Sequence, residues 1–383
     1  MASLNPDDEQ VILVQEPNPF VRLLTLNRPQ QLNAFSNDMA TRLIELFLAY
    51  QKDANVRLVI LKGKERTFSA GADVAAIARL LYEGDWRSSI KLLATLYTLM
   101  YLVATNSKPQ VAILDGLVMG AGAGISTHGR FSVATDNSIF AMPETALGNF
   151  PDMGSSHFLS RLPGSFGEYL SLTGARLDGA DMLACGLATH FVPSDKLALL
   201  EEALVSKMAT TNISSYDLAD TISAIIKEYS HQPDLTERSA LKRMDVINKC
   251  FSKRTVEEIF IALENEAANS KTDEAWLSST MYQLKRASPS SLKVALRSVR
   301  EGRTQGVVEC IAREYRIQCY AMRGDVYSDF KEGCRALLLD KDRSPKWEPS
   351  KLELVEDEIV EKVFNKFDED DELKEFQVPI SKL

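Results

Sequence analysis

The first half of the chain alternates between short apolar runs and longer stretches with helical spacing of apolar positions. The apolar runs predict strands over residues 11–14, 21–26, 57–61, 110–114, 131–135 and 139–141. Helical periodicity predicts helices over residues 36–54, 73–82, 87–105 and 120–129, with Ser36 as the N-cap of the first. This alternation indicates an α/β fold built from repeated strand–strand–helix turns.

Helical patterns dominate the remainder of the chain. Helices are predicted over residues 154–162, 166–172, 179–185, 194–208 and 356–365, and the region 210–345 is almost wholly helical in pattern. We therefore expect three segments. Residues 1–200 form a core that carries the site, residues 201–350 form a helical region packed on it, and residues 351–383 form a charged tail.

Composition and charge exclude several classes of function. The 383 residues are 45% hydrophobic, which is enough for a large core, and the net charge of −9 argues against binding to nucleic acid or to anionic membranes. No apolar run is long enough to span a membrane. Five scattered cysteines and four dispersed histidines predict neither a disulfide framework nor a metal site.

The final tripeptide, Ser381-Lys382-Leu383, matches a peroxisomal address. It follows an acidic stretch, Asp368–Glu375, that we expect to be flexible and to present the tripeptide to the peroxisomal import receptor. The acidic N-terminus does not fit a mitochondrial transit peptide. A peroxisomal location is therefore predicted, against the alternative that three common residues occur there by chance.

A glycine-rich segment, DGLVMGAGAG over residues 115–124, lies between a predicted strand and a predicted helix. Free N–H groups at such a helix start suit a phosphate or a developing oxyanion. A nicotinamide-binding turn would need the motif G-x-G-x-x-G. The third glycine of that motif is replaced here by Ile125 or Thr127, depending on which glycine begins it. Only Asp136, after the next strand, supports that alternative. Glycines placed for close helix packing are a third interpretation.

A second segment, TFSAGAD over residues 67–73, also joins a strand to a helix. It could supply one more backbone N–H, at Ala72. Two such turns in one domain can direct two donors at one oxygen, which is what an oxyanion hole requires.

These segments, together with LTLNRPQ at 24–30 and LNAF at 32–35, resemble the crotonase (enoyl-CoA hydratase/isomerase) superfamily. The resemblance implies a spiral of ββα turns capped by C-terminal helices, with oxyanion donors at the N–H groups of Ala72 and Ala121. It implies no cofactor and no metal, because coenzyme A (CoA) is part of the substrate. It implies a homo-oligomer, unless the long C-terminal part folds back over its own site. It also places CoA or substrate near Leu32, Asn33, Ala34, Ala70, Asp73 and Gly120.

The carboxylates indicate the branch of the superfamily. Hydratases use two glutamates, and the matching positions here are Gly124 and Glu144, so simple hydration is disfavoured. Residues 140–154, 288–294, 314–316 and 329–336 resemble the 3-hydroxyisobutyryl-CoA hydrolases. This resemblance implies hydrolysis of a short-chain 3-hydroxyacyl-CoA thioester in valine catabolism. Leu96 stands where those hydrolases often have a glutamate, so the acyl group could differ.

Glu144 is the predicted catalytic carboxylate, acting as a nucleophile on the thioester or as a general base for water. Asp152 is the second candidate, either as a residue that orients substrate or water or as a helix N-cap. We expect His128 and Cys185 to be structural. The alternatives are an enoyl-CoA isomerase or hydratase, a non-catalytic acyl-CoA-binding protein, and a nicotinamide-dependent oxidoreductase.

Overall fold

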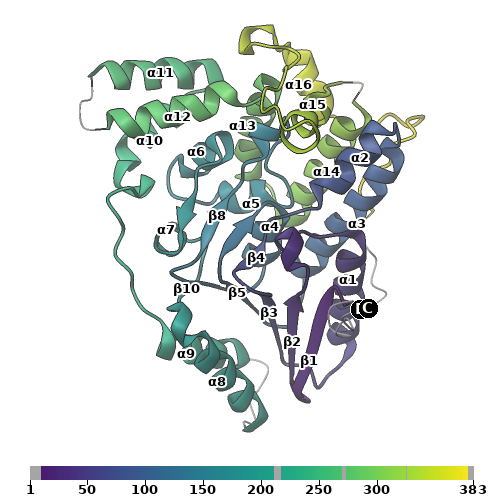
Figure 1. Ribbon diagram of the computed structural model, residues 1–383, viewed down its shortest axis with the longest axis vertical. Coiled ribbons are helices and arrows are strands. Elements are labelled where there is room, and N and C mark those ends of the chain that lie inside the picture. Colours follow the sequence, from purple (N-terminus) through teal and green to yellow (C-terminus); the bar gives the residue numbers. More distant parts are fainter. Residues whose placement is uncertain (1–9, 211–216, 270–272, 325, 378–383) are drawn as a thin grey trace, which may run out of the picture. The chain divides into compact units, whose positions relative to one another are not determined.

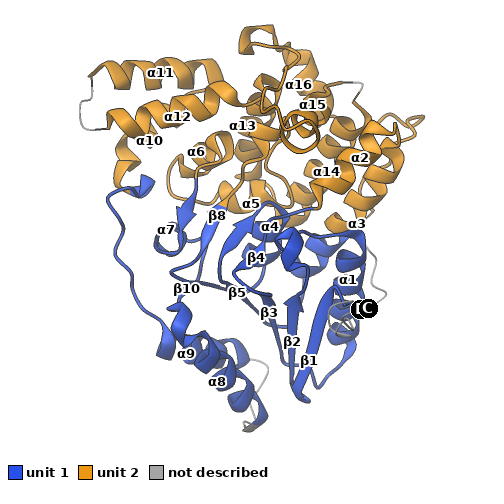
Figure 2. Cartoon of the chain, viewed as in Figure 1, with its two compact units in different colours: residues 1–72, 98–140, 176–241 blue, residues 73–97, 141–175, 242–383 orange. Residues whose placement is uncertain are grey.

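The computed structural model describes residues 10–210, 217–269, 273–324 and 326–377. The tripeptide Ser381–Leu383, predicted to be a peroxisomal address, lies outside this range. Contacts group the chain into two compact units, coloured separately in Figure 2. Unit 1 contains residues 1–72, 98–140 and 176–241, and unit 2 contains residues 73–97, 141–175 and 242–383. The predicted segments follow chain order, whereas each unit collects stretches that are distant in sequence.

Unit 1 is built on a six-stranded sheet with strand order β1-β2-β3-β5-β7-β10. Only the β1–β2 pair is antiparallel, and each of the remaining neighbours runs parallel. β2, β5 and β7 are buried along their whole length, as expected for a parallel sheet with both faces covered. The strands are β1 (Ile12–Asn18), β2 (Val21–Leu26), β3 (Leu58–Gly63), β5 (Gln110–Leu114), β7 (Phe131–Ala134) and β10 (His190–Phe191).

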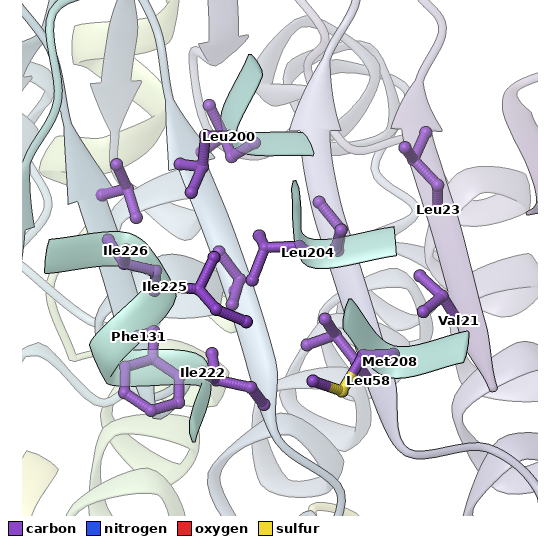
Figure 3. Close-up of a cluster of buried hydrophobic side chains, with 14 of the residues drawn as sticks. Val21, Leu23, Leu58, Phe131, Leu200, Leu204, Met208, Ile222, Ile225 and Ile226 are labelled. Atoms are coloured by element: carbon purple, nitrogen blue, oxygen red, sulfur yellow. The ribbon is translucent and has the colours of Figure 1, made fainter. Parts of the chain in front are cut away.

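Two helices, α8 (Leu197–Thr210) and α9 (Leu218–Tyr229), cover one face of this sheet (Figure 3). The strands contribute alternate residues, such as Leu58 with Ile60, because successive side chains point to opposite faces. α8 contributes Leu200, Leu204 and Met208, which share one face at a spacing of four residues. The strand residues and the helix residues at these two spacings together form one buried apolar cluster.

A second sheet has the order β4-β6-β8-β9, in which β4 and β6 run parallel. Its strands are short: β4 (Thr67–Ser69), β6 (Leu117–Met119), β8 (Ile139–Ala141) and β9 (Leu177–Asp178). The remaining helices of unit 1 are α1 (Asn37–Lys52), α4 (Ala121–Thr127) and α7 (Gly179–Cys185). Ser36 caps α1 by accepting from the Met39 N–H, as predicted.

Unit 2 is helical, and the long helix α3 (Trp86–Ala104) divides between the units after Tyr97. Its centre is α13 (Pro289–Gly302), which packs against α5, α6, α11 and α16 (Figure 1). Gly302 permits close contact, because a Cβ there would lie 2.1 Å from the Ser156 carbonyl oxygen. The other helices are α2 (Val74–Tyr82), α5 (Ser155–Leu159), α6 (Phe166–Thr173), α10 (Met244–Phe251), α11 (Val256–Asn269), α12 (Glu274–Arg286), α14 (Val307–Arg323), α15 (Asp329–Cys334) and α16 (Asp357–Phe364).

The predicted α/β class is confirmed, and so is the helical character of the C-terminal region. β5, β8 and α7 have the predicted bounds. The sequence pattern missed four strands, β4, β6, β9 and β10, each only two or three residues long. Within the described ranges, no helix combines the length and the apolar character needed to cross a membrane.

Candidate active site

Two parallel strands of unit 1 run into small-residue turns that touch each other. β4 ends before Ala70–Ala72, and β6 ends before Gly120. Gly71 has a φ of +104°, which an alanine rarely adopts. A Cβ at Gly71 would lie 3.0 Å from the Met119 carbonyl oxygen and 3.3 Å from the Ala121 nitrogen. Glycine at position 71 therefore lets the first turn approach the start of α4.

The backbone N–H groups of Ala72 and Ala121 remain available in this arrangement. Ala121 is the first residue of α4, where an N–H has no acceptor within its own helix. Among turns, loops and caps of the described residues, neither N–H donates a hydrogen bond. Adjacent turns with two free donors are suited to bind a developing oxyanion, and the oxyanion role of Ala72 and Ala121 stays a prediction.

The loop with the predicted CoA contacts lies against the first turn. The N–H of Ala70 donates to the Leu32 carbonyl at 2.9 Å, and the N–H of Phe35 donates to the Gly71 carbonyl at 2.8 Å. Asn33 is buried, and its side chain makes three hydrogen bonds to the backbone of Arg28, Lys64 and Thr67.

Asn33 therefore fixes the loop rather than presenting its side chain to a ligand. Leu32, by contrast, is 48% exposed. Asp73, which was predicted to lie near CoA or substrate, caps α2 by accepting from the Ala76 N–H at 3.2 Å. In this loop, Leu32 is therefore a residue whose side chain is exposed for the predicted contact with CoA.

Glu144 begins a 3-10 helix, Glu144–Leu147, in unit 2. The Ser288 N–H donates to the Thr145 carbonyl at 3.1 Å, and Gly148, at φ +72°, packs on the Asp329 carbonyl. The Oε2 atom of Glu144 is buried and has no hydrogen-bond partner among the described residues. Burial, and then the charge of Asp152, raise the pKa of Glu144 well above its usual range.

Asp152 does not cap a helix, so that interpretation of its side chain is wrong. α5 begins at Ser155, and its N-cap is Gly154. The Asp152 side chain is 6% exposed, and its Oδ2 accepts from the Tyr97 hydroxyl at 2.9 Å and from the Gln318 Nε2 at 2.8 Å. Burial, followed by the charge of Glu314, raises its pKa to about 7.

A third buried carboxylate, Glu314 on α14, organises the loop after Asp152. It accepts from the Gly154 N–H at 2.5 Å, and from the N–H and hydroxyl of Ser156 at 2.9 and 2.5 Å. The same hydroxyl accepts from Arg313 at 2.8 Å. Burial raises the pKa of Glu314, while its donors lower it. Glu314 therefore holds the backbone that carries Asp152.

Sequence reasoning missed Tyr97, Gln318 and the role of Glu314. Tyr97 lies in an apolar helix, where the sequence pattern by itself indicates only a buried residue. Gln318 and Glu314 are spaced four residues apart, so they share one face of α14. A polar pair on a face otherwise filled by buried residues was the signal available in the sequence.

Other candidate residues are engaged elsewhere. The Ser126 hydroxyl donates to the Ala123 carbonyl at 3.0 Å, which leaves no nucleophilic pair with His128. Asp136 accepts from the N–H and hydroxyl of Ser194 at 2.7 and 2.9 Å, so it has no free role toward a nicotinamide ribose. Cys185 is buried, and burial raises the pKa of its thiol to about 12. Leu96 is fully buried.

Comparison with known proteins agrees with this geometry. The family described as enoyl-CoA hydratase/isomerase matches residues 21–364, and the chain belongs to that family. It is 55% identical over 363 residues to 3-hydroxyisobutyryl-CoA hydrolase 1 of Arabidopsis thaliana, covering 95% of this chain and 93% of the relative. A second Arabidopsis thaliana relative, 42% identical over 97% of this chain and 89% of its own length, is small ribosomal subunit protein mS47.

Among solved structures, a carnitinyl-CoA dehydratase from Mycobacterium thermoresistibile superposes with a TM-score of 0.83 at 32% identity. The match covers 97% of this chain and 99% of that one. The resemblance to the crotonase superfamily and to the 3-hydroxyisobutyryl-CoA hydrolases is confirmed, and the crotonase-like fold with it.

Proposed function

We propose that this protein hydrolyses 3-hydroxyisobutyryl-CoA, or a closely similar short-chain 3-hydroxyacyl-CoA thioester, to the free acid and CoA. The observation that carries the proposal is the buried, unpartnered Oε2 of Glu144, whose charge is coupled to that of Asp152. A buried carboxylate oxygen without a partner is costly, so its retention points to a reacting group outside the protein. The 55% identity to a named hydrolase supports the substrate class.

In the proposed reaction, Glu144 either attacks the thioester carbonyl and displaces CoA thiolate, giving a mixed anhydride that water then hydrolyses, or removes a proton from a water that attacks the thioester directly. The carbonyl oxygen, as it becomes an oxyanion, accepts from the N–H groups of Ala72 and Ala121. Asp152 is present in both protonation states near neutral pH, because its pKa is about 7. It can therefore hold the substrate 3-hydroxyl or deliver a proton to the departing CoA thiolate.

The test is release of free CoA thiol from a panel of CoA esters. Release from 3-hydroxyisobutyryl-CoA, abolished in Glu144→Gln, is the expected result. Incorporation of ¹⁸O from labelled water into Glu144 during a single turnover would identify the nucleophilic route. No thiol release from any 3-hydroxyacyl ester would refute the proposal.

Reversible hydration of an enoyl-CoA is the second candidate. The coupled pair Glu144 and Asp152 could act as base and acid on one water, although Gly124 replaces the glutamate that hydratases use. The same panel separates the two functions, because hydration or isomerisation changes the enoyl absorbance without releasing thiol. Binding of the esters without any turnover would instead indicate an acyl-CoA-binding role, a possibility kept open by the ribosomal relative.

The proposed substrate places the enzyme in valine catabolism. We further propose a homo-oligomer, which sedimentation of the purified protein would test.

A further inference from the structure

The acidic end of the chain is held by arginines of α14. Residues 366–377, here called the C-terminal strap, follow α16 within unit 2. Arg316 forms paired hydrogen bonds with Glu375, with Nε–Oε1 and Nη2–Oε2 distances of 2.8 Å. Arg323 binds Asp371 through both carboxylate oxygens, at 2.7 and 3.0 Å. The acidic stretch that was expected to be flexible is thus tied down, because the arginines that neutralise it lie elsewhere in the sequence.

The apolar residues of the strap close over a buried aromatic cluster. The Phe376 ring lies 6.2 Å from the Tyr97 ring and 5.4 Å from the Tyr315 ring, measured between centroids. Tyr97 and Tyr315 are themselves 5.3 Å apart in an edge-to-face arrangement. Tyr97 is fully buried, and Leu373 of the strap is 4% exposed. Aromatic rings at these separations attract one another in addition to the effect of the apolar area they bury.

The aromatic cluster connects the strap to Asp152, the second carboxylate of the proposed reaction. The Tyr97 hydroxyl donates to Asp152, so the orientation of the Tyr97 ring sets where that donor lies. The helix α14 contacts both Asp152 and the strap. Gln318, on one face, donates to Asp152, whereas Arg316 is two residues away, about 200° around the helix, and binds the strap.

We infer that the C-terminal strap positions Asp152 through Tyr97, and that Phe376 is a positioning residue for the proposed thioester hydrolysis. This inference rests on the proposed function for its catalytic consequence. The physical claim is separate: Phe376 keeps water from Tyr97 and so maintains the desolvated, hydrogen-bonded state of Asp152. Among the neighbouring titratable groups, the charge of Glu314 raises the pKa of Asp152, and the charge of Asp152 in turn raises the pKa of Glu144 and of Tyr327.

The decisive measurement is the titration of the Asp152 side-chain carboxyl, followed by its ¹³C chemical shift and assigned by its absence in Asp152→Asn. Phe376→Ala admits water, and because burial is the largest cause of the raised pKa of Asp152, the titration midpoint should fall toward that of an ordinary aspartate by at least about one pH unit, outweighing the opposite effect of a displaced Tyr97 donor. Tyr97→Phe removes a donor to the carboxylate and should move the midpoint upward. Phe376→Leu keeps the apolar cover and should restore the wild-type midpoint.

Glu372→Gln is the matched control on the strap. Its ion pair with Arg87 is more than half exposed on both sides, and exposed pairs contribute little. It should leave the midpoint and the turnover unchanged. Glu375→Gln loosens the strap without touching the rings and should shift the midpoint in the same direction as Phe376→Ala, which keeps the test valid if the alanine variant does not fold.

Activity provides the second readout. Phe376→Ala should lower kcat for CoA release by roughly tenfold or more, since small displacements of a catalytic group are that costly, with KM changed less than about twofold. An unchanged Asp152 midpoint in folded Phe376→Ala and Glu375→Gln proteins would overturn the inference. If these variants shift the Asp152 midpoint but the wild-type protein releases no CoA from any ester, the positioning of Asp152 by the strap is supported and the proposed hydrolase function is refuted.

Discussion

Replacing Asp152 by asparagine should make the protein more stable at neutral and alkaline pH but not at acid pH. Both hydrogen bonds to this side chain, from Tyr97 and Gln318, end on the same oxygen, Oδ2. The amide oxygen of asparagine can occupy that position and keep both bonds. The variant therefore removes the ionisation of residue 152 while preserving its contacts.

The size of the effect follows from the pKa of Asp152. Burial raises it from 3.8 to about 7, so the folded state holds this proton more tightly than the unfolded chain. A group of this kind reduces stability as pH rises from about 4 to about 7, and the reduction is constant above that range. A shift of about three units corresponds to a loss on the order of 4 kcal/mol in the free energy of unfolding.

Urea denaturation followed by circular dichroism, at intervals from pH 4.5 to pH 8.5, measures this loss. The quantity to compare is the free energy of unfolding of Asp152→Asn minus that of the wild type, because titrating groups that do not interact with Asp152 contribute equally to both proteins. The difference should grow with pH up to about 7 and then level off. A difference that stays constant across the range would refute the assignment of a raised pKa to Asp152.

Three further predictions follow from the site and the sequence. Glu144→Gln should lower kcat for CoA release by about 10³-fold or more without loss of stability, as measured by thiol titration and thermal unfolding, because it removes the reacting carboxylate and a buried ionisable group. Ala121→Pro, which deletes one backbone donor, should lower kcat/KM by about 10²–10³-fold, whereas Ala121→Gly, which keeps it, should have little effect; equal losses in both would argue against the oxyanion role. Import into peroxisomes stays a prediction, and a fluorescent fusion at the N-terminal side should co-localise with a peroxisomal marker only while Ser381–Leu383 is present.

Much of the fold could be predicted because its signals are local. β5 is a continuous apolar run, and α1 combines an apolar face with a serine N-cap. Such patterns are set by backbone geometry and burial within one element. β4 and β6 were missed as strands because three residues are too few to show alternation. The turns that follow them were still predicted, because glycine and alanine between a strand and a helix are conspicuous.

The oxyanion segments and Glu144 could likewise be assigned from the sequence, since each lies in a contiguous motif. The environment of Asp152 could not. Its donors, Tyr97 and Gln318, are 55 and 166 residues away, and nothing local indicates that they meet. The sequence pattern indicates that Tyr97 is buried, and it is. The hydrogen bond from its hydroxyl to Asp152 exists only because the fold brings that carboxylate to it.

The same distinction applies to the acidic end of the chain. Composition alone predicted exposed, flexible charge over Asp368–Glu375. Arginines on α14 instead pair with two of these acids, and Phe376 covers Tyr97. The sequence by itself determined the fold class, the family and the candidate carboxylate, because these depend on local patterns and contiguous motifs. Only the tertiary structure decided the protonation of Asp152 and the place of the strap, because burial and charge pairing depend on residues that are distant in the chain.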